Sequence, residues 1–252
     1  MLKNIIIVKK FTFSIFISSI RDYKSILITL GLPLFMLFTF WITTRDGSVE
    51  SEELLHAMIP AICSLAVMMG GQTQATRLVK WREEGALRRL RLTPIPVNLT
   101  VLGISISQVL IGVVQGVLIT LISLPLIGKE ITFQFFVLVL IIMFIIAVTF
   151  ISLGSLLASV IKKSYMTGYI FFGVFMPLFF IGSFPKEALP EFISNNIHYL
   201  PTTMGIHLVH DLFEFGNFSM NVLFSVSGLI IYSLIFSFLS NFLYLRNNND
   251  TN

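Results

Sequence analysis

The chain has 252 residues, of which 55% are hydrophobic and only 12% are charged. A soluble domain carries about a quarter charged residues, so this composition excludes an ordinary water-soluble enzyme and leaves no room for a separate catalytic domain. The net charge of +4 would suit a nucleic-acid partner, but the basic residues are dispersed between apolar runs, and we expect no nucleic acid to bind.

Residues 1–24 have the pattern of an amphipathic helix that lies on the membrane surface. In a helix its apolar residues would share one face and its polar residues the other. The apolar face would carry Leu2, Ile5, Ile6, Phe13, Phe16, Ile17 and Ile20, and the polar face Lys3, Lys10, Ser14, Arg21 and Lys24. We therefore predict an N-terminal interfacial helix.

Six stretches without Asp, Glu, Lys or Arg follow, and each is long enough to cross a hydrocarbon core of about 30 Å. The third begins after Pro94 and Pro96, which disfavour continuous helix, so we place its start at Val97. The sequence predicts an all-α, polytopic membrane protein that forms a single transmembrane domain over residues 1–252. Its six transmembrane helices are predicted at 25–44, 54–76, 97–128, 131–161, 164–185 and 215–245.

The basic residues predict the orientation of these spans. With the N-terminus inside, 14 of the 17 Lys and Arg residues fall in cytoplasmic segments, and only Arg45, Lys129 and Lys186 fall outside. This asymmetry follows the positive-inside rule, and an odd number of spans would move Arg246 to the outer side. We therefore predict a multi-pass protein of the cell membrane with both termini in the cytoplasm.

The sequence lacks the residues that would power transport or catalysis by itself. No Asp, Glu, Lys or Arg lies deep in a predicted span, whereas transporters driven by ion gradients usually keep such residues there. No phosphate-binding G-x-x-x-x-G-K-[ST] motif occurs.

We predict no catalytic, cofactor-binding or metal-binding residues. The four His residues have only Asp211 and Glu214 near them in the sequence, so we interpret them as side chains at the membrane interface.

The most polar segment is the loop between the second and third spans. It reads RLVKWREEGALRRLRLTPIP from Arg77 to Pro96. As a helix over 77–92 it would pair Glu84 with Arg88 and place Leu87 and Leu90 on one apolar edge. A basic loop held by anionic membrane lipid is the alternative. The acidic residues among the arginines favour docking to a protein partner.

Residues 81–96 of this loop, WREEGALRRLRLTPIP, resemble the first cytoplasmic loop of ABC-2 type permeases, a family of drug, antibiotic, polysaccharide and bacteriocin exporters. In that family the segment is a coupling helix that sits in a groove of a separate ATPase subunit. The family motif is matched by Arg82, Glu83, Glu84, Gly85, Leu87, Leu90, Thr93, Pro94 and Pro96. Ala86 replaces the usual Thr, and Arg88 stands where many members carry an acid.

The resemblance implies a set of coupling residues and a set of partners. The implied coupling residues are Arg77, Lys80, Trp81, Arg82, Glu83, Glu84, Gly85, Leu87, Arg88, Arg89, Leu90 and Pro94. The implied partners are a cytoplasmic ABC ATPase, which would hold ATP and Mg²⁺, and a second permease in a homodimer or heterodimer.

A second similarity to the family lies after the fifth predicted span. Pro185, Pro190 and Pro201 match the proline layout of short outer re-entrant helices in ABC-2 permeases. Leu189, Phe192, Ile193 and Ile197 would share one helical face, as in a helix half-buried at the outer leaflet. We assign Pro185, Pro190, Phe192 and Pro201 to this outer re-entrant segment.

The function that these expectations support is a membrane-spanning permease subunit of an ATP-binding-cassette exporter. It would move an amphipathic small molecule, a lipid or a peptide, such as an antibiotic, out of the cell with ATP hydrolysed by another subunit. The alternative is a membrane scaffold or immunity protein that recruits a cytoplasmic partner without transport.

Overall fold

The structure is a computed structural model that describes residues 2–44, 49–86, 89, 97–128, 131–184, 189–214 and 220–249. Within these ranges it contains helices and no strands, which confirms the all-α prediction. The elements are α1 (Leu2–Arg21), α2 (Tyr23–Thr43), α3 (Val49–Glu83), α5 (Val97–Ser123), η1 (Leu124–Ile127), α6 (Phe133–Val160), α7 (Ser164–Ile170), η2 (Phe171–Phe175), α8 (Met176–Ser183), α9 (Glu191–Asn196), η4 (Ile197–Tyr199), α10 (Pro201–Glu214) and α11 (Met220–Asn249).

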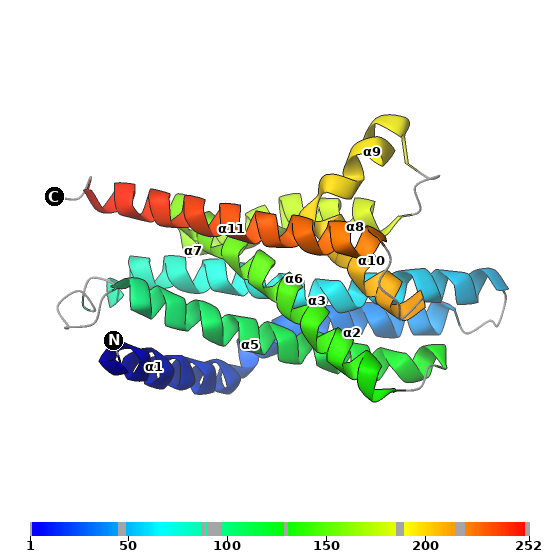
Figure 1. Cartoon of the computed structure of the whole chain (residues 1–252), viewed down its shortest axis with the longest axis horizontal. Helices are drawn as coiled ribbons and strands as arrows, with labels where there is room; N and C mark the ends of the chain where they lie inside the picture. Colours follow the sequence, from blue (N-terminus) through cyan, green and yellow to red (C-terminus); the bar gives the residue numbers. More distant parts are fainter. Residues whose placement is uncertain are drawn as a thin grey trace.

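Among the residues that the structure describes, five helical stretches are long and apolar enough to cross a membrane. They agree closely with five of the predicted spans, and they lie along the long axis of the molecule (Figure 1). The five stretches are Ile26–Thr43, Leu99–Ile127, Phe133–Val160, Ser164–Ser183 and Asn221–Leu243. The protein is therefore a multi-pass membrane protein.

The remaining predicted span, 54–76, lies within α3, which is not among those five. Every residue from 59 to 71 is buried inside the protein, because α2, α5, α6, α7, α8 and α10 pack around this helix. A helix that other helices shield from lipid does not need an apolar surface all round, and the later part of α3 carries Gln72, Thr73 and Gln74. The count of six spans stays a prediction.

α3 and α6 cross with their backbones in contact. A Cβ atom added at Gly154 would collide with the carbonyl group of Gly71, and one added at Gly71 would collide with the carbonyl group of Phe150. One turn earlier in α3, Val67 lies against Gly116 of α5. Small residues at these positions allow the close helix packing that membrane bundles depend on.

The fifth predicted span is continuous but irregular. α7 passes into α8 through one π-helical turn, η2 (Phe171–Phe175), and Pro177 stands in the first turn of α8. Proline has no backbone N–H to donate to the carbonyl of the preceding turn, so the regular i to i−4 pattern cannot continue through this point. The π turn follows from this interruption.

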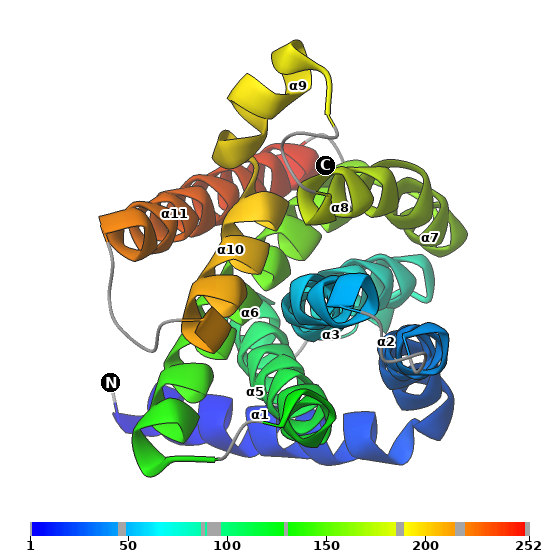
Figure 2. The same cartoon turned by 90° about the vertical axis from the view of Figure 1, so that its right-hand side faces the viewer.

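α1 crosses the bundle obliquely, against the ends of α2 and α5 (Figure 2). Ile15 and Ser19 face the protein and are buried, whereas Phe13 and Ile20 are more than half exposed. Part of the predicted apolar face therefore points away from the helices. That is the arrangement expected of a helix that rests on lipid, but its place at the membrane interface stays a prediction.

Candidate functional site

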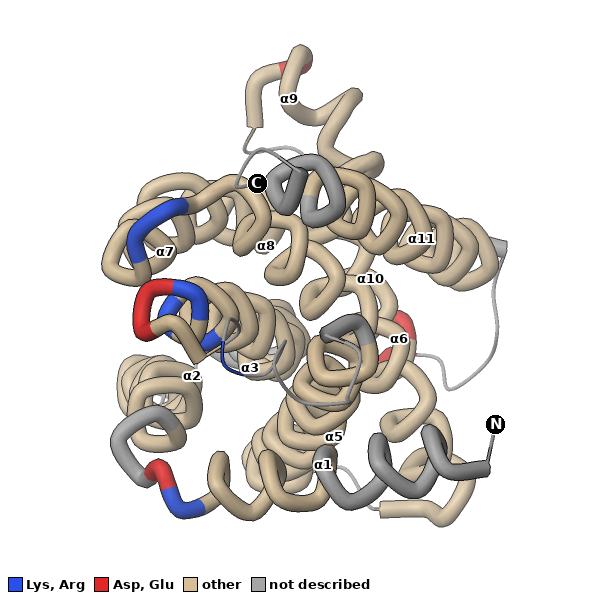
Figure 3. Tube along the Cα trace, turned by 90° about the vertical axis from the view of Figure 1, so that its left-hand side faces the viewer, with Lys and Arg blue, Asp and Glu red and all other residues tan. Residues whose placement is uncertain are grey.

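The basic side chains that the structure describes gather toward one end of the bundle. Figure 3 looks onto this end and shows Lys and Arg on the end of α3, on the connection between α6 and α7, and at the corner between α1 and α2. These residues are Arg21, Arg77, Lys80, Arg82, Arg89, Lys162 and Lys163. Since the predicted coupling residues come from the same region, the end of α3 is the candidate site.

α3 continues past the predicted end of the second span without a break. Residues 77–83 form its last turns, and no helix boundary occurs at Arg77, where the coupling helix was predicted to begin. Leu78 and Val79 are buried against neighbouring helices, which explains why the helix persists here. The chain turns at Gly85, whose φ of 68° lies in the left-handed region that favours glycine.

Arg82 connects the end of α3 to the end of α6. Its guanidinium group donates one hydrogen bond to the carbonyl oxygen of Ala158, at 3.0 Å, and another to the carbonyl oxygen of Ile161. The last carbonyl groups of a helix have no partners within the helix, so an arginine from a neighbouring helix is a suitable donor. Arg82 thus caps α6.

Glu83 holds the start of α7. One carboxylate oxygen accepts a hydrogen bond from the backbone N–H of Ser164 at 3.2 Å, and the other lies 3.8 Å from the ammonium nitrogen of Lys163. Hydrogen bonding from the Ser164 side chain, with smaller contributions from the Ser164 backbone N–H and from the charge of Lys163, lowers the pKa of Glu83 below its ordinary value. Glu83 therefore stays ionised at neutral pH.

Arg82 and Glu83 together attach α3 to both sides of the connection between α6 and α7. We call this set, formed by Arg82, Glu83, Ala158, Ile161, Lys163 and Ser164, the α3–loop contact. It joins segments that lie about 80 residues apart in the chain. A displacement of the end of α3 would therefore also displace the ends of α6 and α7.

A small apolar cluster lies beneath the α3–loop contact. It draws side chains from α1, α3, α5 and α6, with Ile170 of α7 packed against it. The buried members are Ile15, Leu78, Val79, Ile104, Ala158 and Ile161, and Trp81 is among the partly buried residues around them. Close-packed interiors transmit displacement, so this cluster links the end of α3 to four other helices.

Arg77 attaches α3 to α1. Its guanidinium group donates a hydrogen bond to the hydroxyl oxygen of Ser19 at 2.6 Å, and that hydroxyl donates to the carbonyl of Ile15 at 2.8 Å. A hydrogen bond from a charged donor contributes about 1.5–3 kcal/mol. Arg77 thus faces the interior of the protein instead of a cytoplasmic partner.

The outward side of the same segment carries mixed charge. Lys80 and Glu84 form a pair at 3.9 Å and are both more than half exposed. Arg89 is also exposed, and its backbone N–H donates to the carbonyl of Gly85 at 3.1 Å. A pair as exposed as Lys80 and Glu84 contributes less than about 1 kcal/mol to folding, so these charges remain available for a partner.

The predicted coupling residues therefore divide into an inward group and an outward group. Arg77, Trp81, Arg82 and Glu83 contact other helices of the same chain, whereas Lys80, Glu84 and Arg89 face outward. Leu87, Arg88, Leu90 and Pro94 lie outside the described residues, and with them the predicted pair of Glu84 and Arg88.

The predicted outer re-entrant segment lies at the opposite end of the bundle (Figure 1). Pro190 precedes α9, and its carbonyl accepts a hydrogen bond from the N–H of Ile193 at 2.9 Å. The side chain of Phe192 is 82% exposed, so it does not pack on the other helices, and its place in the outer leaflet stays a prediction. Pro201 begins α10, most of whose residues are buried against α3, α6, α8 and α11. Pro185 lies outside the described residues.

Histidine side chains cluster near α10. The rings of His198 and His207 lie 5.7 Å apart, and His210 lies 3.6 Å from Glu214. Among the described residues no three His, Cys, Asp or Glu side chains converge in a way that could hold a metal ion.

Residues 9–213 match the family model described as ABC-2 type transporter, a range that begins within α1, ends in the last turn of α10 and includes the whole α3–loop contact. The chain belongs to the ABC-2 type transporter family. A search of curated proteins finds no match. Family membership makes this chain a permease subunit of an ABC transporter, and an ABC ATPase is the partner that such a subunit implies in general.

Several residues of the ABC-2 permease site were not predicted from the sequence. Ser19, Lys163 and Ser164 contact the end of α3, and so do the backbone carbonyls of Ala158 and Ile161. The charged break at Lys162 and Lys163 between two apolar runs was a usable signal, because it marks a corner on the same side as the coupling segment. No pattern in the sequence marks the two serines or the two backbone carbonyls.

Proposed function

We propose that this permease exports an amphipathic substrate, which would be a small molecule, a lipid or a peptide such as an antibiotic, with energy from ATP hydrolysed on a separate subunit. The observation that carries the proposal is the α3–loop contact. It gives a segment with an outward charged face a direct connection to several membrane helices.

In this mechanism the ATPase binds the outward face formed by Lys80, Glu84 and Arg89 together with the chain that follows. ATP and Mg²⁺ would be held by that partner. Closure of two ATPase subunits would displace the end of α3, and Arg82 and Glu83 would pass the displacement to α6 and α7. The apolar cluster around Leu78 would pass it to α1 and α5. Substrate would then leave on the side of α9 and α10.

This scheme requires two permeases, identical or related, and the topology predicted from the charges. The described basic residues gather at the end of α3, as the positive-inside rule expects of a cytoplasmic end. The topology has six spans, with both termini inside the cell and α9 and α10 on the outside.

The topology predicts which loops a membrane-impermeant thiol reagent can reach. In a variant with Cys63→Ser, cysteines placed singly by Asp22→Cys and Lys162→Cys should react only after the cells are permeabilised. A cysteine placed by Lys129→Cys should react in intact cells. If α3 did not cross the membrane, residues 22 and 162 would lie on opposite sides, and only one of them would be protected.

The ATPase partnership predicts a defined loss in a double variant of the outward face. Glu84→Ala with Gly85→Pro removes the outward carboxylate and forbids the positive φ at residue 85. We expect this variant to lose at least tenfold in co-purified ATPase and in transport-coupled hydrolysis, measured after gentle extraction from native membrane. A Glu191→Ala variant at the opposite end serves as the control. Unchanged co-purification of the double variant would refute the assignment.

The alternative function is a scaffold or immunity protein that recruits a partner without transport. The same purification separates the two, because a scaffold would bring no ATPase subunit with it. The internal connections of Arg77, Arg82 and Glu83 favour transport, since a recruiting surface would not need to be attached to the ends of α1, α6 and α7.

A further inference from the structure

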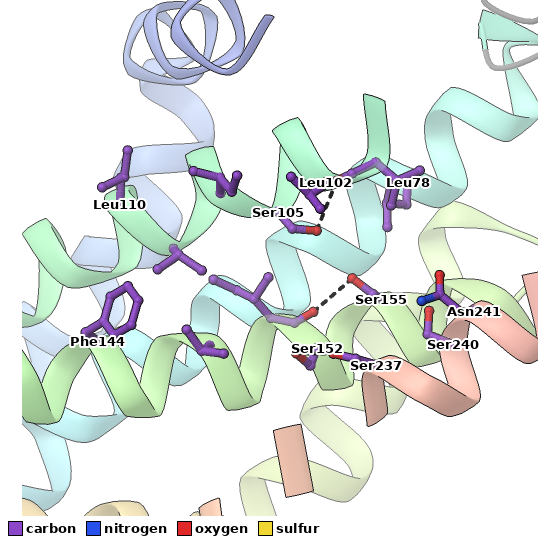
Figure 4. Close-up of a pocket in the computed structure, with 15 residues that line it drawn as sticks. Leu78, Leu102, Ser105, Leu110, Phe144, Ser152, Ser155, Ser237, Ser240 and Asn241 are labelled. Carbon is purple, nitrogen blue, oxygen red and sulfur yellow. Dashed lines mark hydrogen bonds between the residues drawn. The ribbon is translucent and has the colours of Figure 1, made fainter. Parts of the chain in front are cut away.

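A cavity of about 760 Å³ lies between α5, α6 and α11, with Leu78 of α3 behind it (Figure 4). Its volume falls within the range of roughly 300–1,000 Å³ found for small-molecule sites. The helices around it carry large exposed apolar side chains, including Leu102, Phe144 and Phe238. The cavity therefore lies on a surface that faces the hydrocarbon of the bilayer.

All polar side chains of the lining lie toward one end of the cavity, where Leu78, Val101 and Leu102 also line it, whereas the other end is lined by apolar side chains alone. The polar end holds Ser105, Ser152, Ser155, Ser237, Ser240 and Asn241, and Figure 4 shows them coming from three different helices. All six lie within about three turns of the end of the bundle where α3 ends. Toward the middle of the bundle, Leu110 and Phe144 line the cavity.

A buried amide fixes part of the polar end. Gln74 of α3 is fully buried, and its Nε2 donates to the hydroxyl oxygens of Ser105, at 2.9 Å, and Ser155, at 3.2 Å. Both hydroxyls in turn donate to backbone carbonyls of their own helices, at 3.1 and 3.0 Å. These two serines therefore have no proton left to offer a ligand.

The polar side chains that α11 contributes to the cavity are not hydrogen-bonded to Gln74. Ser237 donates to Ser152 at 3.1 Å. Ser240 and Asn241 make no hydrogen bond with any group that the structure describes, although both line the cavity. Both residues lie within one turn of Leu243, where the apolar stretch of α11 ends, and a polar group that loses water there without gaining a partner costs free energy. A ligand that accepts hydrogen bonds would satisfy them.

We propose that this cavity binds one glycerophospholipid from the leaflet nearest the end of α3. Its ester and phosphate oxygens accept hydrogen bonds from Ser240 and Asn241, and an acyl chain lies against Leu110 and Phe144. The polar and apolar ends of the cavity follow the same order as those of a lipid in that leaflet. The backbone carbonyls of a helix from a second copy would already be paired within that helix, so such a helix could accept these hydrogen bonds only through its side chains.

The test uses the full chain reconstituted in nanodiscs that contain a phospholipid with a photoreactive diazirine on one acyl chain. We expect crosslinks concentrated on the peptides that contain Leu110 and Phe144. Native mass spectrometry should show one phospholipid retained after most of the surrounding lipid has been removed. Ser240→Ala with Asn241→Leu should reduce both signals about tenfold, because two hydrogen bonds are lost.

A matched control keeps the test specific. Ser227→Ala with Ser233→Ala alters exposed hydroxyls on α11 that do not line the cavity and that donate to carbonyls of their own helix. This variant should behave like the unmodified chain. Crosslinks spread evenly over all lipid-facing helices, or unchanged in the Ser240 and Asn241 variant, would overturn the proposal. Crosslinks from this face to a second copy in place of lipid would also overturn it. None of these outcomes depends on ATP or on the direction of transport.

Discussion

A methyl group added at Gly154 is expected to separate α3 from α6 and to destabilise the fold by about 3 kcal/mol. The added Cβ atom would overlap the carbonyl group of Gly71, which is backbone and cannot rotate away as a side chain would. α3 is the central helix, and α6 makes extensive contact with it, so the displacement cannot stay local. Gly154→Ala should therefore unfold well below the temperature of the unmodified chain.

The single cysteine supplies the measurement. Cys63 is the only cysteine of the sequence, and its side chain is fully buried within α3. A dye that becomes fluorescent on reaction with a thiol will therefore report the unfolding of this helix during a thermal ramp in detergent. Gly31→Ala is the control, because a Cβ atom at Gly31 meets nothing within 4 Å and alanine favours helix. Equal midpoints for the two variants would contradict the predicted backbone contact.

Arg82→Ala is expected to separate ATPase binding from ATPase coupling. The guanidinium group lies inside the protein, on the carbonyls of Ala158 and Ile161, so its loss leaves the outward charges of Lys80 and Glu84 in place. The ATPase should still co-purify. Coupled hydrolysis should fall at least tenfold, which corresponds to about 1.4 kcal/mol and is less than the loss of two hydrogen bonds from a charged donor.

Two further variants, one conservative and one a control, test whether the loss comes from the hydrogen bonds of Arg82. Arg82→Lys keeps the charge but cannot reach two carbonyls in the same planar geometry, so it should give an intermediate loss. Lys162→Ala removes a basic residue from the same end of the bundle and should have little effect, since the described structure gives its side chain no hydrogen bond or ion pair. If Arg82→Ala also lost the ATPase, then Arg82 would belong to the docking surface. The division into inward and outward groups would then be wrong.

Much of the fold could be predicted from the sequence because a bilayer permits few solutions. Apolar runs of about 20 residues must form helices, since no water is present to pair their backbone groups. Five of the six predicted spans correspond to apolar helices within a few residues, and the motif from Arg82 to Pro96 was enough to indicate the family. These features depend on local composition and on short segments of chain.

The position and extent of α3 could not be predicted in the same way. Hydropathy placed the end of the second span at residue 76, but α3 continues to Glu83 because Leu78 and Val79 pack against neighbouring helices. Its polar residues Gln72 and Gln74 mark a helix surrounded by protein. Gln74 in fact donates to serines of α5 and α6.

The sequence by itself determined that this protein is helical, spans a membrane several times and belongs to the ABC-2 type transporter family. Only the tertiary structure decided which coupling residues face inward, where Arg82 and Glu83 find their partners, and that serines from three helices share one cavity. The reason is physical. Hydropathy and motifs are read over about 20 consecutive residues. These contacts join residues about 80 positions apart, and whether such residues meet depends on how whole helices pack.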